Sequence, residues 1–276
     1  MKEYVQFCGS KYVTSKIAGI YRDIEQELDM GKTVLFTGTP CQVYAVKQYC
    51  ERNGVNTSKL YLVDIICHGT GIVRVWEKYK EWLEEKYKNK IAKFDFRYKK
   101  AKWKSYPVRV VFENGKVLVN THDARLYTNL FLSRLNMRDC CYQCNFANLD
   151  RPSDLTIADF WGISKVMPDF PKGNGTSEIL VNTEKGEEIL CGIEKLPHVT
   201  IKECLSDAYI QYQHNLTSPT EKNPRREKFK ADLERLPFDD VLRIYAGNDL
   251  KGKTIYLVKR ILGEVGLTDL LKKVLK

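Results

Sequence analysis

The stretch Val34-Leu35-Phe36-Thr37-Gly38-Thr39-Pro40-Cys41-Gln42 decides the fold. Its first three residues form a short apolar β run, and the Gly38-Thr39-Pro40 triplet turns the chain. The pattern from Gln42 to about Arg52 predicts a helix that ends near Asn53-Gly54. A strand, a tight turn and a helix in this order are typical of the first half of a βαβ unit.

The same order recurs immediately downstream. Leu60 to Ile66 is an apolar run rich in β-branched residues, which predicts a buried strand. After His68-Gly69, the segment from Ile72 to Tyr87 has the spacing of an amphipathic helix. Two such units in succession predict a parallel sheet core.

The pattern then changes. Val108 to Phe112 and Lys116 to Val119 flank Glu113-Asn114-Gly115, which predicts a β-hairpin. Asp123 is expected to cap a helix running to about Arg134, and the chain turns helical from about Pro224. We therefore predict an α/β fold with a mixed sheet, βαβ units in the first third, a hairpin insertion and a helical C-terminal tail. The predicted domains are 1–220 and 221–276.

Composition narrows the class of protein. The chain has 276 residues, of which 43% are hydrophobic and 29% charged, as in a globular protein. The N-terminus resembles no signal peptide and no apolar run is long enough for a membrane span, so we expect a cytoplasmic protein. Nine cysteines in a reducing compartment favour metal binding, redox chemistry or buried thiols over disulfides.

Four cysteines stand where predicted elements end. Cys41 follows the first turn, Cys67 follows the second strand, and Cys141 and Cys144 form a CxxC. Thiols at loop ends suit a soft metal or an iron–sulfur cluster. The alternative is that Cys41 and Cys67 are small apolar residues packed at helix starts. Cys140, beside the CxxC, is ambiguous, and the following are expected to be ordinary buried thiols: Cys8, Cys50, Cys191 and Cys204.

The net charge of +10 favours an anionic partner. The Gly38–Pro40 turn at a helix start suits an anion. The strip from Arg97 to Lys104 mixes basic and aromatic residues, which fits a polyanionic cofactor, a nucleic acid or a solvated edge hairpin. We rank nucleic acid last, because an anionic cofactor explains the same charges. The basic, amphipathic tail from Leu250 to Lys276 could contact a membrane surface, or dock on the core or a partner.

Together these segments resemble the coenzyme F-420 hydrogenase/dehydrogenase beta-subunit family, between about residues 8 and 195. The motifs occur in the family's order and are as follows: Gly9-Ser10-Lys11-Tyr12-Val13-Thr14-Ser15, Thr37-Gly38-Thr39-Pro40-Cys41-Gln42, Val63-Asp64-Ile65-Ile66-Cys67-His68-Gly69, Phe96-Arg97 with Lys99 and Trp103, Arg138 with Cys141-Tyr142-Gln143-Cys144, Asp154 to Gly162, and Val181 to Gly186.

The resemblance implies a flavin- and iron–sulfur-dependent oxidoreductase. It would pass electrons between a 4Fe–4S cluster, FAD and a deazaflavin or other acceptor, and bacterial relatives are often linked to polysaccharide biosynthesis. The resemblance implies cluster ligands at Cys41, Cys67, Cys141 and Cys144. It implies cofactor contacts at Gly9, Ser10, Lys11, Ser15, Thr37, Gly38, Thr39, Pro40, Arg97 and Lys99. Hydride transfer at a flavin needs no protein nucleophile, so no catalytic side chain is assigned.

The N-terminus also departs from the family. Relatives usually begin with a ferredoxin-like region, whereas this chain begins almost at the Gly9-Ser10-Lys11 motif. We therefore expect a ferredoxin-type or upstream subunit to supply that region. The alternative function is a truncated, non-catalytic module stabilised by zinc.

Overall fold

The computed structural model describes residues 9–98, 107–171 and 175–264. Its contacts divide the chain into two compact units, each built from segments that are distant in sequence. The sheet unit comprises Ser15–Gly69 and Asp139–Thr220, and the aromatic unit comprises Met1–Thr14, Thr70–Arg138 and Glu221–Lys276. The division into 1–220 and 221–276 stays a prediction.

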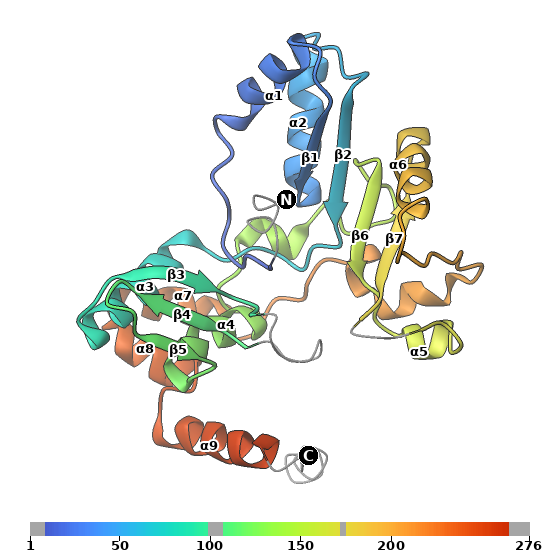
Figure 1. Cartoon of the computed structure of the whole chain (residues 1–276). Coiled ribbons are helices and arrows are strands. Elements are labelled where there is room, and N and C mark those ends of the chain that lie inside the picture. The colour runs from blue at the N-terminus through green and yellow to red at the C-terminus, as the bar shows by residue number, and fades with distance from the viewer. Residues whose placement is uncertain (1–8, 99–106, 172–174, 265–276) are drawn as a thin grey trace. The chain divides into compact units, whose positions relative to one another are not determined.

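A four-stranded mixed sheet forms the centre of the sheet unit (Figure 1). Its strand order is β1 (Val34–Gly38), β2 (Leu60–Ile65), β6 (Leu155–Asp159) and β7 (Ser177–Val181). The first three strands run parallel, and β7 pairs antiparallel with β6. Gly38 pairs with Asp64, so β1 and β2 reach the same edge of the sheet with their carboxyl ends.

Two helices cover one face of β1 and β2. They are α1 (Ile20–Asp29) and α2 (Pro40–Arg52), and their apolar side chains meet those of the strands. The buried members of this cluster are Ile24, Leu28, Val43, Val46, Cys50, Leu60 and Leu62. The remaining helices of the unit are α5 (Ile163–Val166), α6 (Glu184–Glu194) and 3-10 helices over Asp139–Gln143, Asp207–Tyr212 and His214–Leu216.

The aromatic unit combines a small antiparallel sheet with helices (Figure 1). The sheet has the order β3 (Ile91–Asp95), β4 (Arg109–Phe112) and β5 (Val117–Val119). The helices are α3 (Val73–Tyr87), α4 (His122–Leu132), α7 (Arg226–Arg235), α8 (Phe238–Tyr245) and α9 (Leu250–Glu264).

Aromatic rings dominate the core of this unit. The ring of Trp76 meets Phe94 edge-on at 4.8 Å and Tyr127 edge-on at 5.2 Å between centroids. Tyr79 is fully buried, and its hydroxyl donates to the backbone carbonyls of Asp123 and Ala124 at 2.9 and 3.0 Å. Edge-to-face ring pairs add to the free energy gained by burying aromatic area, so this core is a strong source of stability.

The fold class predicted from the sequence is confirmed. The βαβ unit β1–α2–β2, the hairpin β4–β5 and the C-terminal helices all form. Helix α3, which follows β2 in sequence, packs into the aromatic cluster through Val75, Tyr79 and Leu83. The cap predicted for α4 was wrong: the hydroxyl of Thr121, not Asp123, accepts the Ala124 N–H at 3.3 Å. No helix in the described part of the chain is long and apolar enough to cross a membrane.

Candidate metal centre

The four candidate ligands all belong to the sheet unit. Cys41 lies in the first turn of α2, directly after β1, and Cys67 lies in the loop after β2. Because parallel strands bring their carboxyl ends to one edge, the two thiols are presented at the same edge of the sheet. Cys141 lies in the 3-10 helix Asp139–Gln143, and Cys144 directly follows it.

Burial and three other thiols affect the pKa of Cys67. Burial is the main cause that raises this pKa, to about 12, and the N–H of Gly69 opposes the rise. Negative charge on Cys141, Cys41 and Cys144 raises it further. Since charges interact appreciably with a partly buried group only at short range, the structure brings the other three thiols into the surroundings of Cys67.

The side chains do not, as they stand, enclose a single metal ion. Among the described residues, no group of three or more His, Cys, Asp or Glu side chains could hold one. A tetrahedral zinc ion requires sulfur atoms about 3.8 Å apart, since each Zn–S bond is about 2.3 Å long. A cluster with iron at several corners spaces its cysteine ligands more widely. Four thiolates are the usual ligand set of an iron–sulfur cluster, and the role of these four cysteines as ligands stays a prediction.

Groups that can form hydrogen bonds lie beside two of these sulfur atoms. The Gly69 N–H donates to the Cys67 sulfur at 3.4 Å, and the Thr39 hydroxyl lies 3.2 Å from the Cys41 sulfur. Gly69 has φ +116°, a conformation that side chains disfavour, and this turn directs its N–H back toward the sulfur. Hydrogen bonds to ligand sulfur stabilise its anionic form and tune reduction potentials.

A buried ion pair fastens the CxxC loop to β2. Arg151 and Asp64 side chains are 1% and 0% exposed, and their Nη2 and Oδ1 atoms lie 3.0 Å apart. The same guanidinium donates to the carbonyls of Ile65 at 3.1 Å and Phe146 at 2.7 Å. Burial raises the pKa of Asp64, while Thr156 and Arg151 oppose the rise. Arg151 therefore ties the segment after Cys144 to the strand that leads to Cys67.

The candidate cofactor contacts divide between the two units. In the sheet unit, the Gln42 amide nitrogen donates to Ser15 at 2.9 Å. The Gln42 amide oxygen accepts from the Thr39 N–H and hydroxyl, both at 3.1 Å. This bridge joins Ser15 to the Thr37–Pro40 turn, both of which the sequence singled out. Gly9, Ser10, Lys11 and Arg97 belong to the aromatic unit, and Lys99 lies outside the described residues, as does most of the Arg97–Lys104 strip.

The remaining cysteines partly follow the prediction. Cys50 is fully buried between α2 and the sheet, as expected. The prediction for Cys191 was wrong, because its side chain is exposed on α6. Helix α6 touches the sheet through Gly186, where an added Cβ would lie 2.2 Å from the Asp154 carbonyl oxygen, so Cys191 falls on the outward side. Cys204 is half-buried, Cys140 is exposed, and Cys8 lies outside the described residues.

The sheet unit is a mixed α/β sheet with a βαβ unit and with Cys41 and Cys67 directly after the carboxyl ends of two parallel strands. The comparison with family models specifies the class of protein. Residues 31–205 match the family described as the C terminus of the coenzyme F420 hydrogenase/dehydrogenase beta subunit, and the chain belongs to this family. The resemblance seen in the sequence is thereby confirmed. No curated protein matches the chain closely enough to count as a relative.

Sequence reasoning missed the residues that position the site. Gln42 was recognised only as part of a motif, although the capping box Thr39-x-x-Gln42 was a usable signal for its role. Arg151 gave no local signal, because its partner Asp64 is 87 positions earlier in the chain. A buried arginine is recognisable only once the fold is known.

Proposed function

We propose that this chain is the C-terminal electron-transfer domain of a flavin- and iron–sulfur-dependent oxidoreductase. The observation that carries the proposal is that Cys41 and Cys67 follow the carboxyl ends of two paired parallel strands, in the same unit as the CxxC of Cys141 and Cys144. Membership of a family of F420 hydrogenase/dehydrogenase beta subunits supports a redox role. The electrons would pass between a 4Fe–4S cluster, FAD and a deazaflavin or other acceptor.

In this proposal the four thiols hold the cluster, which supplies one-electron transfer when bound. The protein's own residues do the rest. The Gly69 N–H donates a hydrogen bond to the Cys67 sulfur, and the Thr39 hydroxyl lies beside the Cys41 sulfur. Arg151 holds the CxxC loop against β2, so that the ligands from distant segments keep one geometry.

The flavin would be held by backbone and side chains at the Ser15–Gln42–Thr39 bridge. The turn at Gly38–Pro40 starts α2, and N–H groups at a helix start stabilise phosphate oxygens. Gly9, Ser10, Lys11, Arg97 and Lys99 remain proposed cofactor contacts. A partner subunit of ferredoxin type, which would supply a neighbouring electron carrier, and a link to polysaccharide biosynthesis belong to this proposal as well.

Anaerobic reconstitution with iron and sulfide tests the cluster. We expect about four irons per chain and broad visible absorption that bleaches on reduction. Cys67→Ser and Cys141→Ser should each lose most of the iron. Cys191→Ser is the matched control, because it removes an exposed thiol of the same unit, and it should retain the wild-type iron content.

The zinc-stabilised module is the competing function, and the same preparation distinguishes it. One zinc per chain, no sulfide and no flavin in the folded wild-type protein would support that module and contradict the proposal. Flavin binding is tested separately by titrating FAD into wild-type protein and Gln42→Ala. The variant should bind FAD about tenfold more weakly if the Ser15–Thr39 bridge contributes.

A further inference from the structure

One side of helix α9 contacts the rest of the aromatic unit. The Tyr256 hydroxyl donates to the Asn120 carbonyl at 2.7 Å, and the Tyr256 ring meets His122 edge-on at 5.5 Å. One turn earlier, Gly252 touches the Gly247 carbonyl so closely that an added Cβ would lie 2.2 Å from the oxygen. Because residues four apart share a face of a helix, Gly252 and Tyr256 mark the docked side of α9.

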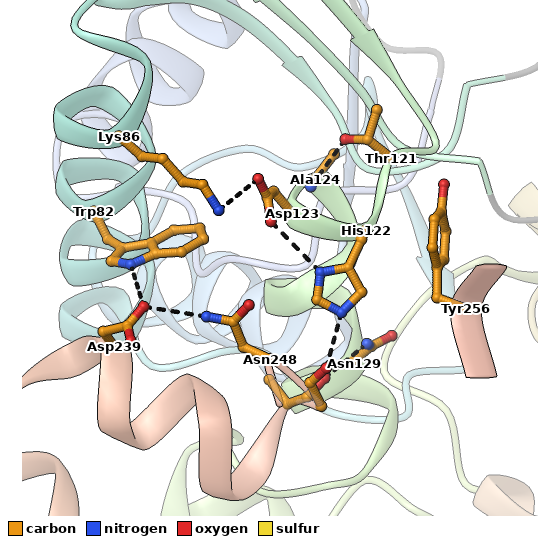
Figure 2. Close-up of polar contacts among 12 residues, drawn as sticks. Trp82, Lys86, Thr121, His122, Asp123, Ala124, Asn129, Asp239, Asn248 and Tyr256 are labelled. Atoms are coloured by element: carbon orange, nitrogen blue, oxygen red, sulfur yellow. Dashed lines mark hydrogen bonds and ion pairs between the residues drawn. The ribbon is translucent and has the colours of Figure 1, made fainter. Parts of the chain in front are cut away.

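A polar network connects the residues that α9 contacts (Figure 2). His122 Nε2 lies 2.8 Å from the Gly247 carbonyl oxygen, and its other ring nitrogen faces Asp123 at 3.5 Å. Asp123 in turn pairs with Lys86 at 2.8 Å. Gly247, in the turn before α9, is therefore connected through His122 to α4, and through Asp123 and Lys86 to α3.

The opposite side of α9 is apolar and exposed. Leu250, Leu257, Val258 and Ile261 are 85%, 54%, 43% and 51% exposed. Their spacing of seven, eight and eleven residues places them on one stripe of a helix with 3.6 residues per turn. That stripe lies about half a turn around the helix from Gly252 and Tyr256.

Positive charges accompany this stripe. Lys251, Lys253, Lys259 and Arg260 are exposed on the same helix, and no acidic residue occurs between Leu250 and Leu262. The whole chain carries a net charge of +10. An exposed apolar stripe with basic residues beside it is the pattern of a helix that lies in the headgroup layer of an anionic bilayer.

We propose that α9 docks the protein onto an anionic lipid surface, with Leu250, Leu257, Val258 and Ile261 inserted among the lipids. A second copy of the chain and a nucleic acid are the alternative binding partners, and both suit this surface less well. A second copy of the chain would bring the same lysines face to face, and like charges repel. A nucleic acid would pair with the lysines but would leave the apolar stripe in water.

Sedimentation with lipid vesicles tests this inference on the full chain. We expect the protein to pellet with vesicles of phosphatidylcholine and phosphatidylserine and to stay in the supernatant with phosphatidylcholine alone. Raising the salt concentration should weaken binding, because surface charges are screened. Failure to pellet with the anionic vesicles at low salt would overturn the proposal.

Two variant pairs separate the apolar from the electrostatic contribution. Leu257→Ser with Ile261→Ser should weaken vesicle binding at least tenfold, because two inserted side chains are lost. The matched control is Leu196→Ser with Leu205→Ser, which removes leucines that are 53% and 89% exposed in the sheet unit and should leave binding unchanged. Lys251→Gln with Lys253→Gln should cost about fivefold per residue, whereas Lys195→Gln with Lys202→Gln should not.

Other results would distinguish a lipid surface from a second copy of the chain or a nucleic acid as the partner of α9. Wild-type binding by the Leu257/Ile261 variant would overturn the proposal, as would a dimer that this variant converts to monomer. Binding to duplex DNA without binding to anionic vesicles, unchanged in the Leu257/Ile261 variant, would also overturn it. Circular dichroism of each variant verifies the fold, and the lysine pair tests the surface without touching the apolar stripe.

Discussion

The two units differ in how they are stabilised, and the difference corresponds to where chemistry is proposed. The aromatic unit is held by a large core of rings around Tyr79, and it also buries the guanidinium of Arg226, which donates to the Met137 carbonyl at 2.8 Å. The sheet unit has a smaller aliphatic cluster and buries the ion pair of Arg151 and Asp64 beside its thiols. Burying charge is costly, whereas burying rings is favourable. In the sheet unit this cost falls beside the candidate ligands, where Arg151 holds the segment that follows Cys144.

The largest effect is expected from the aromatic core. Tyr79→Ala should lower the free energy of unfolding by about 4 kcal/mol, because it removes a fully buried ring and a hydroxyl hydrogen bond shared between two carbonyls. Urea unfolding followed by tryptophan fluorescence measures this. The control Tyr44→Ala, at a side chain 44% exposed in the sheet unit, should cost less than about 1 kcal/mol. Equal costs for the two would contradict the contrast between the units.

The next effect concerns the buried ion pair of the sheet unit. Arg151→Ala should cost about 3 kcal/mol, since it leaves the Asp64 carboxylate buried without its cation. The control Arg235→Ala removes an arginine 74% exposed that pairs with Asp232 at 3.5 Å, and should cost less than about 0.5 kcal/mol. If Arg151→Ala leaves the urea midpoint of unfolding at the wild-type value, the ion pair with Asp64 does not stabilise the CxxC loop.

The comparison also shows what a sequence can predict. The strands β1 and β2, the hairpin β4–β5 and the strand-end positions of Cys41 and Cys67 follow from local patterns that cover fewer than ten residues each. Helix α1 was not predicted from the sequence, and Arg151 pairs with a residue 87 positions away. Local patterns also misled at Cys191, where a thiol in an apolar helix segment faces outward. What depends on long-range packing could not be predicted from single motifs.

Helix caps give a smaller comparison between the units. The Thr183 hydroxyl accepts the Gly186 N–H at 3.2 Å and donates to Asp154 Oδ1 at 2.6 Å. The Thr121 hydroxyl accepts the Ala124 N–H at 3.3 Å. Thr183→Ala should therefore cost about 2 kcal/mol and Thr121→Ala about 1 kcal/mol in urea unfolding. The reverse order would show that the bond to Asp154 contributes nothing.

The smallest expected effect is on how the free energy of unfolding depends on pH. Asp123 in the aromatic unit and Glu178 in the sheet unit should change it in opposite directions. Burial raises the pKa of Asp123, but Lys86, Tyr87 and His122 outweigh it and leave the pKa lowered. Asp123 therefore stabilises the fold above its unfolded pKa of about 3.9, and this contribution is lost as the pH falls through the lowered folded pKa.

Glu178 behaves in the opposite way. Burial raises its pKa, against a hydrogen bond from Gln213, so the folded state binds a proton more readily than the unfolded state. Stability from this group grows as the pH falls from the raised folded pKa toward about 4.3. The free energy of unfolding should be measured against pH. Asp123→Asn should remove the Asp123 contribution that the wild type loses at low pH, and Glu178→Gln should remove the contribution that the wild type gains as the pH falls. Parallel curves for wild type and both variants would contradict these signs.

X-ray absorption at the iron edge of the reconstituted full chain tests the central claim most directly. If Cys41, Cys67, Cys141 and Cys144 hold one cluster, the nearest shell around iron will be sulfur alone, with neighbouring irons beyond it. Cys67→Ser will then lose that iron–iron signal, whereas Cys191→Ser will keep it. Iron surrounded by oxygen or nitrogen with no second iron, or a signal that survives Cys67→Ser unchanged, would contradict the account.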